Sequence, residues 1–284
     1  MNESLSESTS LLISCADERN IKHVYNEHNW LQHFFIGNII WLIKRRTDIF
    51  YSLGWKDNFD KKITPSGSLY KWKNKKNTNK SIDILFISGL SLFNKAIHCS
   101  SYGESGIKTN PTIFFKMNKL FFSSLEKKAL DKIYFRGYPN SSSQFGNYFY
   151  SDNYLNEFKS SFKTIDYDIK NSGTDLISRS KLVVVNYVST PWIQSLISNV
   201  PTVIIVNPET YFLVESEKNY FKILSDEKIV HFSALSAAKF INEIHENPQK
   251  WWLKEKTQFA LKKFLNKNIG KPEKFIDHLI ELTY

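Results

Sequence analysis

Cysteine and methionine are scarce in this sequence, with two of each among 284 residues. Cys15 and Cys99 are too few for a disulfide scaffold or a cysteine-based zinc site. The most apolar stretch, Leu31 to Ile43, is interrupted by polar residues and is too short to span a bilayer. The first ten residues lack the basic start of a secretory signal. These absences favour a soluble, cytoplasmic protein.

Familiar ligand-binding and catalytic motifs are also missing. The chain has neither a glycine-rich dinucleotide fingerprint nor a Walker A loop. No serine-centred nucleophile elbow is present. His23, His28 and His33 lie close in sequence but are not spaced as metal ligands on one helix face. We therefore expect no metal and no cofactor.

What the chain does have is a basic excess and many aromatic residues. The 38 Lys and Arg residues outnumber the 28 Asp and Glu residues, so the net charge is +10. Such a charge favours an anionic partner, which could be a nucleic acid, a sugar nucleotide or an acidic lipid. No signature of a nucleic-acid-binding module is present, so we expect no nucleic acid. Peripheral contact with the inner face of an anionic membrane is a further option.

A basic segment without periodicity divides the chain. Residues 71–80 are polar and rich in lysine, which is typical of a linker. We expect a short or partial α/β domain in residues 1–70 and a complete domain in residues 81–284. In the first part we predict strands and one helix, at Leu11–Cys15, His23–Tyr25, Asp48–Leu53 and, for the helix, Trp30–Arg46.

Beyond the linker, apolar runs alternate with amphipathic segments. The predicted strands are Ile82–Ser88, Lys132–Arg136, Lys181–Asn186 and Pro201–Val206. The predicted helices are Pro111–Leu130, Gly173–Ser180, Pro191–Asn199, Glu215–Leu224, Ser233–Glu246 and Pro248–Asn266. Strands that alternate with helices form βαβ units, so we predict a mostly parallel, Rossmann-like sheet.

In an open α/β sheet the ligand lies beyond the carboxyl ends of the strands. That rule selects four segments that follow predicted strands: Ser88 and Gly89, Arg136 to Asn140, Asn186 to Thr190, and Asn207 to Glu209. Ser189 and Thr190 would begin a helix, where free N–H groups suit a phosphate; on local sequence alone an ordinary helix cap is the more common explanation. Arg136 could neutralise a diphosphate, or could be a surface arginine at a strand end.

Three segments of the second half resemble a known family: Lys132-Ile-Tyr-Phe-Arg-Gly-Tyr-Pro139, Asp175-Leu-Ile-Ser-Arg-Ser-Lys-Leu-Val-Val-Val-Asn-Tyr-Val-Ser-Thr190 and Ser195-Leu-Ile-Ser-Asn-Val-Pro-Thr-Val-Ile-Ile-Val-Asn-Pro208. They resemble the donor half of GT-B glycosyltransferases from bacterial surface-polysaccharide clusters, above all a transferase family associated with O-antigen synthesis. Kdo, sialyl and polyol-phosphate transferases are more distantly similar. The resemblance implies a GT-B-like fold.

The resemblance also implies roles for single residues. Relatives place an Arg-x-Tyr-Pro element after one strand and a Ser/Thr pair after the next, and both engage the donor nucleotide. Here Arg136, Tyr138 and Pro139 match the first element, and Ser189 and Thr190 match the second. The full donor-binding set that we expect comprises Ser88, Gly89, Arg136, Tyr138, Pro139, Asn186, Ser189, Thr190, Gln194 and Asn207.

The weaker upstream resemblance implies that His28 is the general base and Glu27 the second candidate. The expected partners are a nucleotide-sugar donor, with a CMP-linked acidic sugar as the first to test, and a glycan or lipid-linked glycan acceptor. Relatives usually carry a Glu where Gln194 stands, and charged residues where Phe212 and Val214 stand. These departures, together with the short first domain, favour as the alternative a donor-binding remnant without turnover.

Overall fold

The computed structural model of this chain describes the following residues: 14–27, 32–35, 40–57, 60–67, 79–88, 111–136, 166–167, 172–186, 190–209, 211–270, 276–277 and 280–281. Within these ranges, no helix has both the length and the hydropathy that a bilayer span requires.

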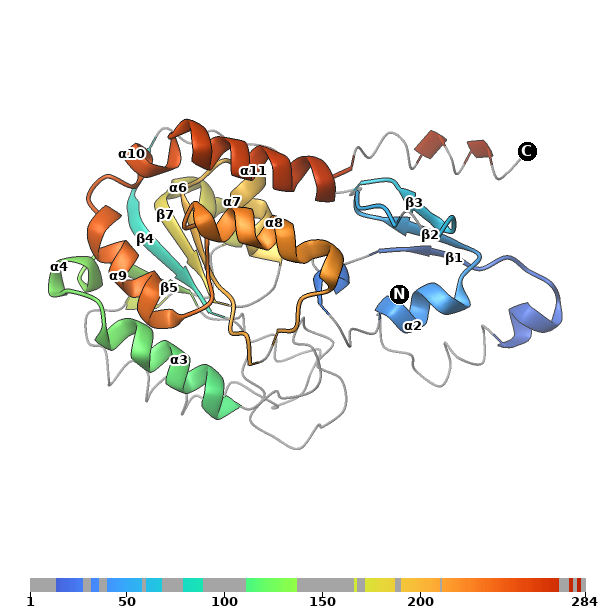
Figure 1. The fold of residues 1–284 in the computed structure, drawn as a ribbon, viewed down its shortest axis with the longest axis horizontal. Helices are drawn as coiled ribbons and strands as arrows, with labels where there is room; N and C mark the ends of the chain where they lie inside the picture. Colours follow the sequence, from blue (N-terminus) through green and yellow to red (C-terminus); the bar gives the residue numbers. More distant parts are fainter. Residues whose placement is uncertain are drawn as a thin grey trace.

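Six parallel strands form the larger of two sheets (Figure 1). They are β4 (Ile82–Ile87), β5 (Ile133–Arg136), β6 (Asp166–Tyr167), β7 (Ser180–Val185), β8 (Thr202–Ile205) and β9 (Val230–His231). Their spatial order is β6-β5-β4-β7-β8-β9, which is the Rossmann order, with a switch point between β4 and β7. The predicted parallel sheet is confirmed. The two-residue strands β6 and β9 were not predicted, because two residues carry no readable pattern.

Helices cover both faces of this sheet (Figure 1). One face carries α3 (Pro111–Ser123) and α9 (Ala234–Ile244), which pack against each other. The other face carries α6 (Gly173–Arg179), α7 (Thr190–Ile197), α8 (Glu215–Asp226) and α11 (Glu255–Asn268). Two short helices, α4 (Lys127–Leu130) and α10 (Pro248–Trp252), also belong to this part of the described chain. We call the six-stranded sheet with its helices the larger module, and the three-stranded sheet with its helices the smaller module.

Two long helices predicted from the sequence are each broken in two. The predicted helix Pro111–Leu130 is interrupted between α3 and α4, where the Asn242 side chain bonds the backbone of Ser124 and Glu126. The predicted helix Pro248–Asn266 is interrupted between α10 and α11, where Gln258 Nε2 donates to the Trp252 carbonyl at 2.8 Å. Periodicity alone does not reveal such breaks, since the apolar faces continue across them.

The smaller sheet has three parallel strands, β1 (Val24–Asn26), β2 (Ile49–Ser52) and β3 (Ile63–Pro65). Residues 14–18 are helical, so the predicted strand at Leu11–Cys15 is wrong in its described part. The predicted helix Trp30–Arg46 is also wrong as one element: it holds the 3-10 turn η1 (Gln32–Phe34) and helix α2 (Ile40–Arg46). Phe35, directly after η1, forms a β-bridge with Leu213 of the larger module.

The turn η1 enters the core of the larger module. The Phe34 ring lies 6.2 Å from Trp192, 5.4 Å from Phe221 and 5.6 Å from Phe264, measured between ring centroids. The carbonyl of Phe34 accepts a hydrogen bond of 2.9 Å from the Val214 N–H. Aromatic contacts of this kind bury large apolar areas, so η1 fixes the smaller sheet to the larger module.

A second contact joins the modules at the carboxyl end of β2. Gly54 pairs with Ile269, and the Gly270 N–H donates to the Leu53 carbonyl at 2.9 Å. Gly54 has a φ of +143°, and a Cβ on it would lie 2.0 Å from the Gly270 nitrogen. Both the conformation and the space therefore require glycine at this position.

Replacing Gly54 with alanine should lower the free energy of unfolding by about 2 kcal/mol or more, because it adds backbone strain to a backbone clash. Gly173→Ala is the matched control: its Cβ would meet its nearest described atoms at 3.5 Å, an ordinary van der Waals distance. Urea denaturation measures both. Equal stabilities for the two variants would contradict the described junction.

His231, at the end of β9, is buried and neutral. Its Nε2 lies 3.0 Å from the Lys228 carbonyl and its Nδ1 lies 2.9 Å from the Ser236 hydroxyl. Burial lowers the pKa of His231 to about 4, against an ordinary value of 6.5. Burial also lowers the pKa of His245, with Lys132 as the second cause.

Stability should therefore fall as the pH falls below 6.5, because the unfolded chain then binds a proton at His231 that the folded chain does not. Between pH 7.5 and 5.0 this histidine accounts for a loss of about 2 kcal/mol. His231→Gln should reduce the drop by that amount, while His245 contributes equally in both proteins. Urea denaturation at the two pH values tests this. An unchanged drop in the variant would rule out His231 as its source.

Candidate functional site

Three buried polar side chains meet at the switch point of the larger sheet. Ser88 follows β4, Asn186 follows β7, and Asn118 reaches them from α3. Asn186 Nδ2 donates to Asn118 Oδ1 and, at 3.5 Å, to the Ser88 hydroxyl. Asn118 Nδ2 donates to the same hydroxyl at 3.4 Å. Because buried polar groups are stable only when hydrogen-bonded, this network orients the first residues of two loops.

Arg136 ends β5 beside this network. Its carbonyl accepts a hydrogen bond of 2.9 Å from the Ser88 N–H, so the two strand ends are in register. The side chain is 9% exposed, and its guanidinium carbon lies 3.5 Å from the point that a Cβ on Gly173 would occupy. The guanidinium therefore packs over the first residue of α6, at the carboxyl edge where the open-sheet rule expects the ligand.

The remaining described donor-site candidates follow β7 and β8. Thr190 is the first residue of α7, and Gln194 lies half-buried one turn further along. Asn207 follows β8, and its side-chain oxygen accepts a hydrogen bond of 2.9 Å from the Glu209 N–H. This turn directs the chain towards Leu213, which pairs with Phe35. The structure thus brings the described candidates to one edge of one sheet.

Five predicted site residues, namely His28, Gly89, Tyr138, Pro139 and Ser189, lie outside the described residues. Their roles remain predictions.

Glu27, the second candidate base, has a buried carboxylate at the carboxyl end of β1. Its Oε2 accepts hydrogen bonds from the Leu53 N–H at 2.8 Å and from Trp55 Nε1 at 2.7 Å. Its Oε1 lies 3.8 Å from Nδ1 of His33. Both hydrogen bonds of this carboxylate are made to residues of the smaller module. Glu27 is therefore suited to hold the segment from Leu53 to Trp55 in position.

His33 carries the same network across to α11. Its ring stacks on Trp55 with centroids 4.6 Å apart, and its Nε2 lies 3.1 Å from Asn268 Oδ1. Asn268 Nδ2 donates to the Phe264 carbonyl, so Oδ1 faces the histidine and His33 Nε2 carries a proton. The buried chain from Glu27 to Asn268 therefore links both modules at the junction.

Sequence reasoning missed Asn118. It lies in the middle of α3, in the apolar sequence Pro-Thr-Ile-Phe-Phe-Lys-Met-Asn-Lys-Leu-Phe-Phe-Ser. An amide beside buried positions such as Met117 and Phe121 was the available signal, because a polar residue on an apolar helix face needs a buried partner. Naming that partner required the packing of α3 on the sheet.

The arrangement is suited to an anionic ligand. The network supplies positioned strand ends, Arg136 supplies a fixed cation, and Thr190 supplies a hydroxyl at a helix start. Among the described residues, no group of three or more His, Cys, Asp and Glu side chains could hold a metal ion. The chemistry that these residues offer is recognition of phosphate by donors and charge.

Comparison with known proteins is consistent with this geometry. The family model of the LIC12162 family transferases matches residues 2–281. The chain belongs to this family. The expected membership of a GT-B-type transferase family is thereby confirmed. No curated protein sequence matches the chain.

Solved structures show the fold of the LIC12162 family member. The pneumococcal O-GlcNAc transferase GtfA, in complex with UDP and GlcNAc, matches with a TM-score of 0.52 and 14% identity, over 97% of this chain and 55% of that one. The chain thus spans about half of the length of GtfA. The wall teichoic acid polymerase TagF (TM-score 0.40, 14% identity, 84% and 58% covered) and the kitacinnamycin glycosyltransferase (0.44, 9%, 94% and 72%) match too weakly to support an argument. The GT-B-like α/β fold is confirmed by GtfA.

Removing the Asn118 side chain should destabilise this family member. Asn118→Ala removes the oxygen that accepts from the Asn186 amide and one of the donors to the Ser88 hydroxyl, which should lower the free energy of unfolding by about 1–3 kcal/mol. Asn266→Ala is the matched control, since Asn266 is an exposed residue of α11 and should change stability by about 0.5 kcal/mol or less. Urea denaturation compares the two. Equal effects would remove the structural basis of the network.

Proposed function

We propose that this transferase moves a sugar from a nucleotide donor to a glycan or lipid-linked glycan acceptor of a bacterial surface polysaccharide. The observation that carries the proposal is the buried Ser88–Asn118–Asn186 network at the switch point, with Arg136 beside it. This is the edge where an open α/β sheet binds its ligand. Family membership and the GT-B-like fold support the reaction class.

In the proposed mechanism the donor phosphates lie between Arg136 and the start of α7. Leaving-group charge that develops on the phosphate would be stabilised by the Arg136 guanidinium and by the hydroxyl of Thr190, with Ser189 as its expected neighbour. Asn186, Gln194 and Asn207 would hold the rest of the nucleotide. Direct displacement at the anomeric carbon needs a base on the acceptor side.

His28 remains our proposal for that base. Glu27, which precedes it, would act as a positioning residue, because its carboxylate is buried and bonded to Leu53 and Trp55. The donor is proposed to be a CMP-linked acidic sugar, from the resemblance to sialyl and Kdo transferases. UDP, which the GtfA structure contains, is the second nucleotide to test.

A second candidate function is donor binding without turnover. Phe212 and Val214 stand where relatives carry charged residues, and the segment that holds them packs against η1 and Phe35. Leu213 pairs with Phe35, and the Val214 N–H donates to Phe34. A segment occupied in this way contributes to the junction and offers no charged side chain between Tyr211 and Val214 to the donor.

Calorimetric titration with CMP-, UDP- and GDP-linked sugars tests the donor site. We expect one nucleotide to bind, and Arg136→Gln to weaken it about tenfold or more by removing a charge-assisted contact. Arg179→Gln is the matched control, because it removes the same charge from a surface ion pair with Asp175. Equal binding by both variants would exclude Arg136 from the site.

Turnover on glycan acceptors separates the two candidates. Release of free nucleotide that depends on the acceptor supports the transferase, whereas tight donor binding without any release supports the non-catalytic alternative. If no donor binds and RNA binds with a steep dependence on salt, both candidates are wrong.

A further inference from the structure

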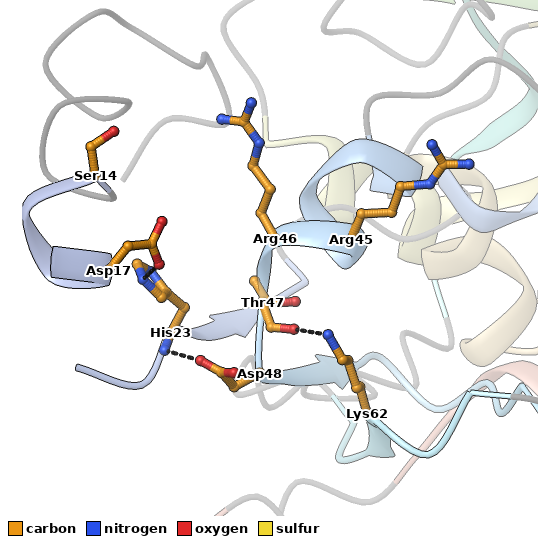
Figure 2. A pocket seen from close by; sticks show the side chains of 8 residues that line it. All are labelled: Ser14, Asp17, His23, Arg45, Arg46, Thr47, Asp48 and Lys62. Atoms are coloured by element: carbon orange, nitrogen blue, oxygen red, sulfur yellow. Dashed lines mark hydrogen bonds and ion pairs between the residues drawn. The ribbon is translucent and has the colours of Figure 1, made fainter. Parts of the chain in front are cut away.

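A pocket lined by both basic and acidic side chains lies in the smaller module, at the amino ends of its strands. It has a volume of about 500 Å³. Figure 2 shows its lining, with Arg46 rising between the helical turn of residues 14–18 and Lys62. Figure 1 places this end of the small sheet on the side away from the larger sheet. The charged and titratable residues that line it are Asp17, His23, Arg45, Arg46, Asp48 and Lys62.

The acidic groups of this pocket are already engaged. Asp48 Oδ2 accepts a hydrogen bond of 2.8 Å from the His23 N–H, and Asp17 Oδ1 lies 2.8 Å from Nε2 of the same histidine. Lys62 Nζ donates to the Thr47 carbonyl at 3.0 Å (Figure 2). Both carboxylates and the lysine therefore have partners within the lining itself.

The two arginines differ from their neighbours. Arg45 and Arg46 are exposed in the last turn of α2, and within the described residues neither guanidinium group forms an ion pair or a side-chain hydrogen bond. Lys44, one position earlier, is bound by Asp57 at 2.9 Å and Asp60 at 3.2 Å. Lys44 of this basic run is therefore neutralised by two aspartates, whereas no described carboxylate forms an ion pair with either guanidinium group.

We propose that this pocket binds a phosphate-bearing anion through Arg45 and Arg46. Guanidinium groups bind phosphate oxygens through paired N–H donors, and Lys62 and His23 lie in the same lining to add charge or hydrogen bonds. The pocket is separate from the proposed donor site, which lies at the carboxyl edge of the larger sheet. The phosphate could belong to a free ligand or to a lipid headgroup, and both present the same oxygens.

The test uses the full chain with the double variant Arg45→Gln/Arg46→Gln. Calorimetry with pyrophosphate measures binding of a free phosphate ligand. Co-sedimentation with phosphatidylcholine vesicles, with and without phosphatidylglycerol, measures binding to a lipid headgroup. We expect the native protein to bind in at least one arm, and the variant to bind about tenfold more weakly there. Salt should weaken both, because the sites are exposed.

Two controls separate this pocket from general charge and from the donor site. Lys262→Gln/Lys263→Gln removes the same two charges from adjacent exposed positions on α11 and should bind as the native protein does. Because pyrophosphate could also bind at the proposed donor site, the titration is repeated in the Arg136→Gln background, and binding that remains there and is lost on adding Arg45→Gln/Arg46→Gln belongs to this pocket. Circular dichroism confirms that each variant is folded.

Each outcome decides the proposal. Pyrophosphate binding that is lost in Arg45→Gln/Arg46→Gln but not in Lys262→Gln/Lys263→Gln supports a free phosphate ligand. Vesicle binding that requires phosphatidylglycerol and is lost only in Arg45→Gln/Arg46→Gln supports a lipid headgroup. The proposal is overturned if the native protein binds in neither arm, if both double variants weaken equally, or if only Arg136→Gln abolishes binding.

Discussion

The insertion of Phe34 among Trp192, Phe221 and Phe264 is the contact on which the arrangement of the two sheets depends. A three-stranded sheet of short strands has little core of its own, and its described apolar cluster is small. Burying η1 in the larger core supplies the missing apolar area. The His33–Asn268 hydrogen bond and the close approach of Gly54 to Gly270 then set the orientation, because hydrogen bonds and backbone sterics tolerate less displacement than apolar packing does.

That junction also brings strand ends of the two sheets together. Glu27 and Leu53 stand at the carboxyl ends of β1 and β2, and Leu213 follows the carboxyl end of β8. Leu53 accepts a hydrogen bond from Gly270 just after α11, Glu27 lies 3.8 Å from His33 of η1, and Leu213 pairs with Phe35 just after η1, so these three chain segments all lie at the junction.

Much of the larger sheet could be predicted because buried parallel strands are continuous apolar runs, as in Ile82–Ile87. The carboxyl-edge rule then selected Ser88, Arg136 and Asn186 without knowledge of packing. Other features depend on contacts that lie far apart in sequence. Asn118 meets Asn186 only when α3 packs on the sheet, and the helix predicted over Trp30–Arg46 is divided because Phe34 and Phe35 are buried against the other module. Local patterns cannot report a partner that the fold supplies.

The same limit applies to charge. A net charge of +10 suggests an anionic partner but not its place. Lys44, Arg45 and Arg46 carry the same charge in the sequence. In the fold, however, Lys44 pairs with two aspartates, whereas both arginines are exposed. At the other module, Arg136 is held almost buried at a strand end. A cation that already has a carboxylate partner contributes less to recognition than an exposed cation that lines a pocket, as Arg45 and Arg46 do. The pairing of individual charges, more than their sum, therefore determines where this protein can bind phosphate.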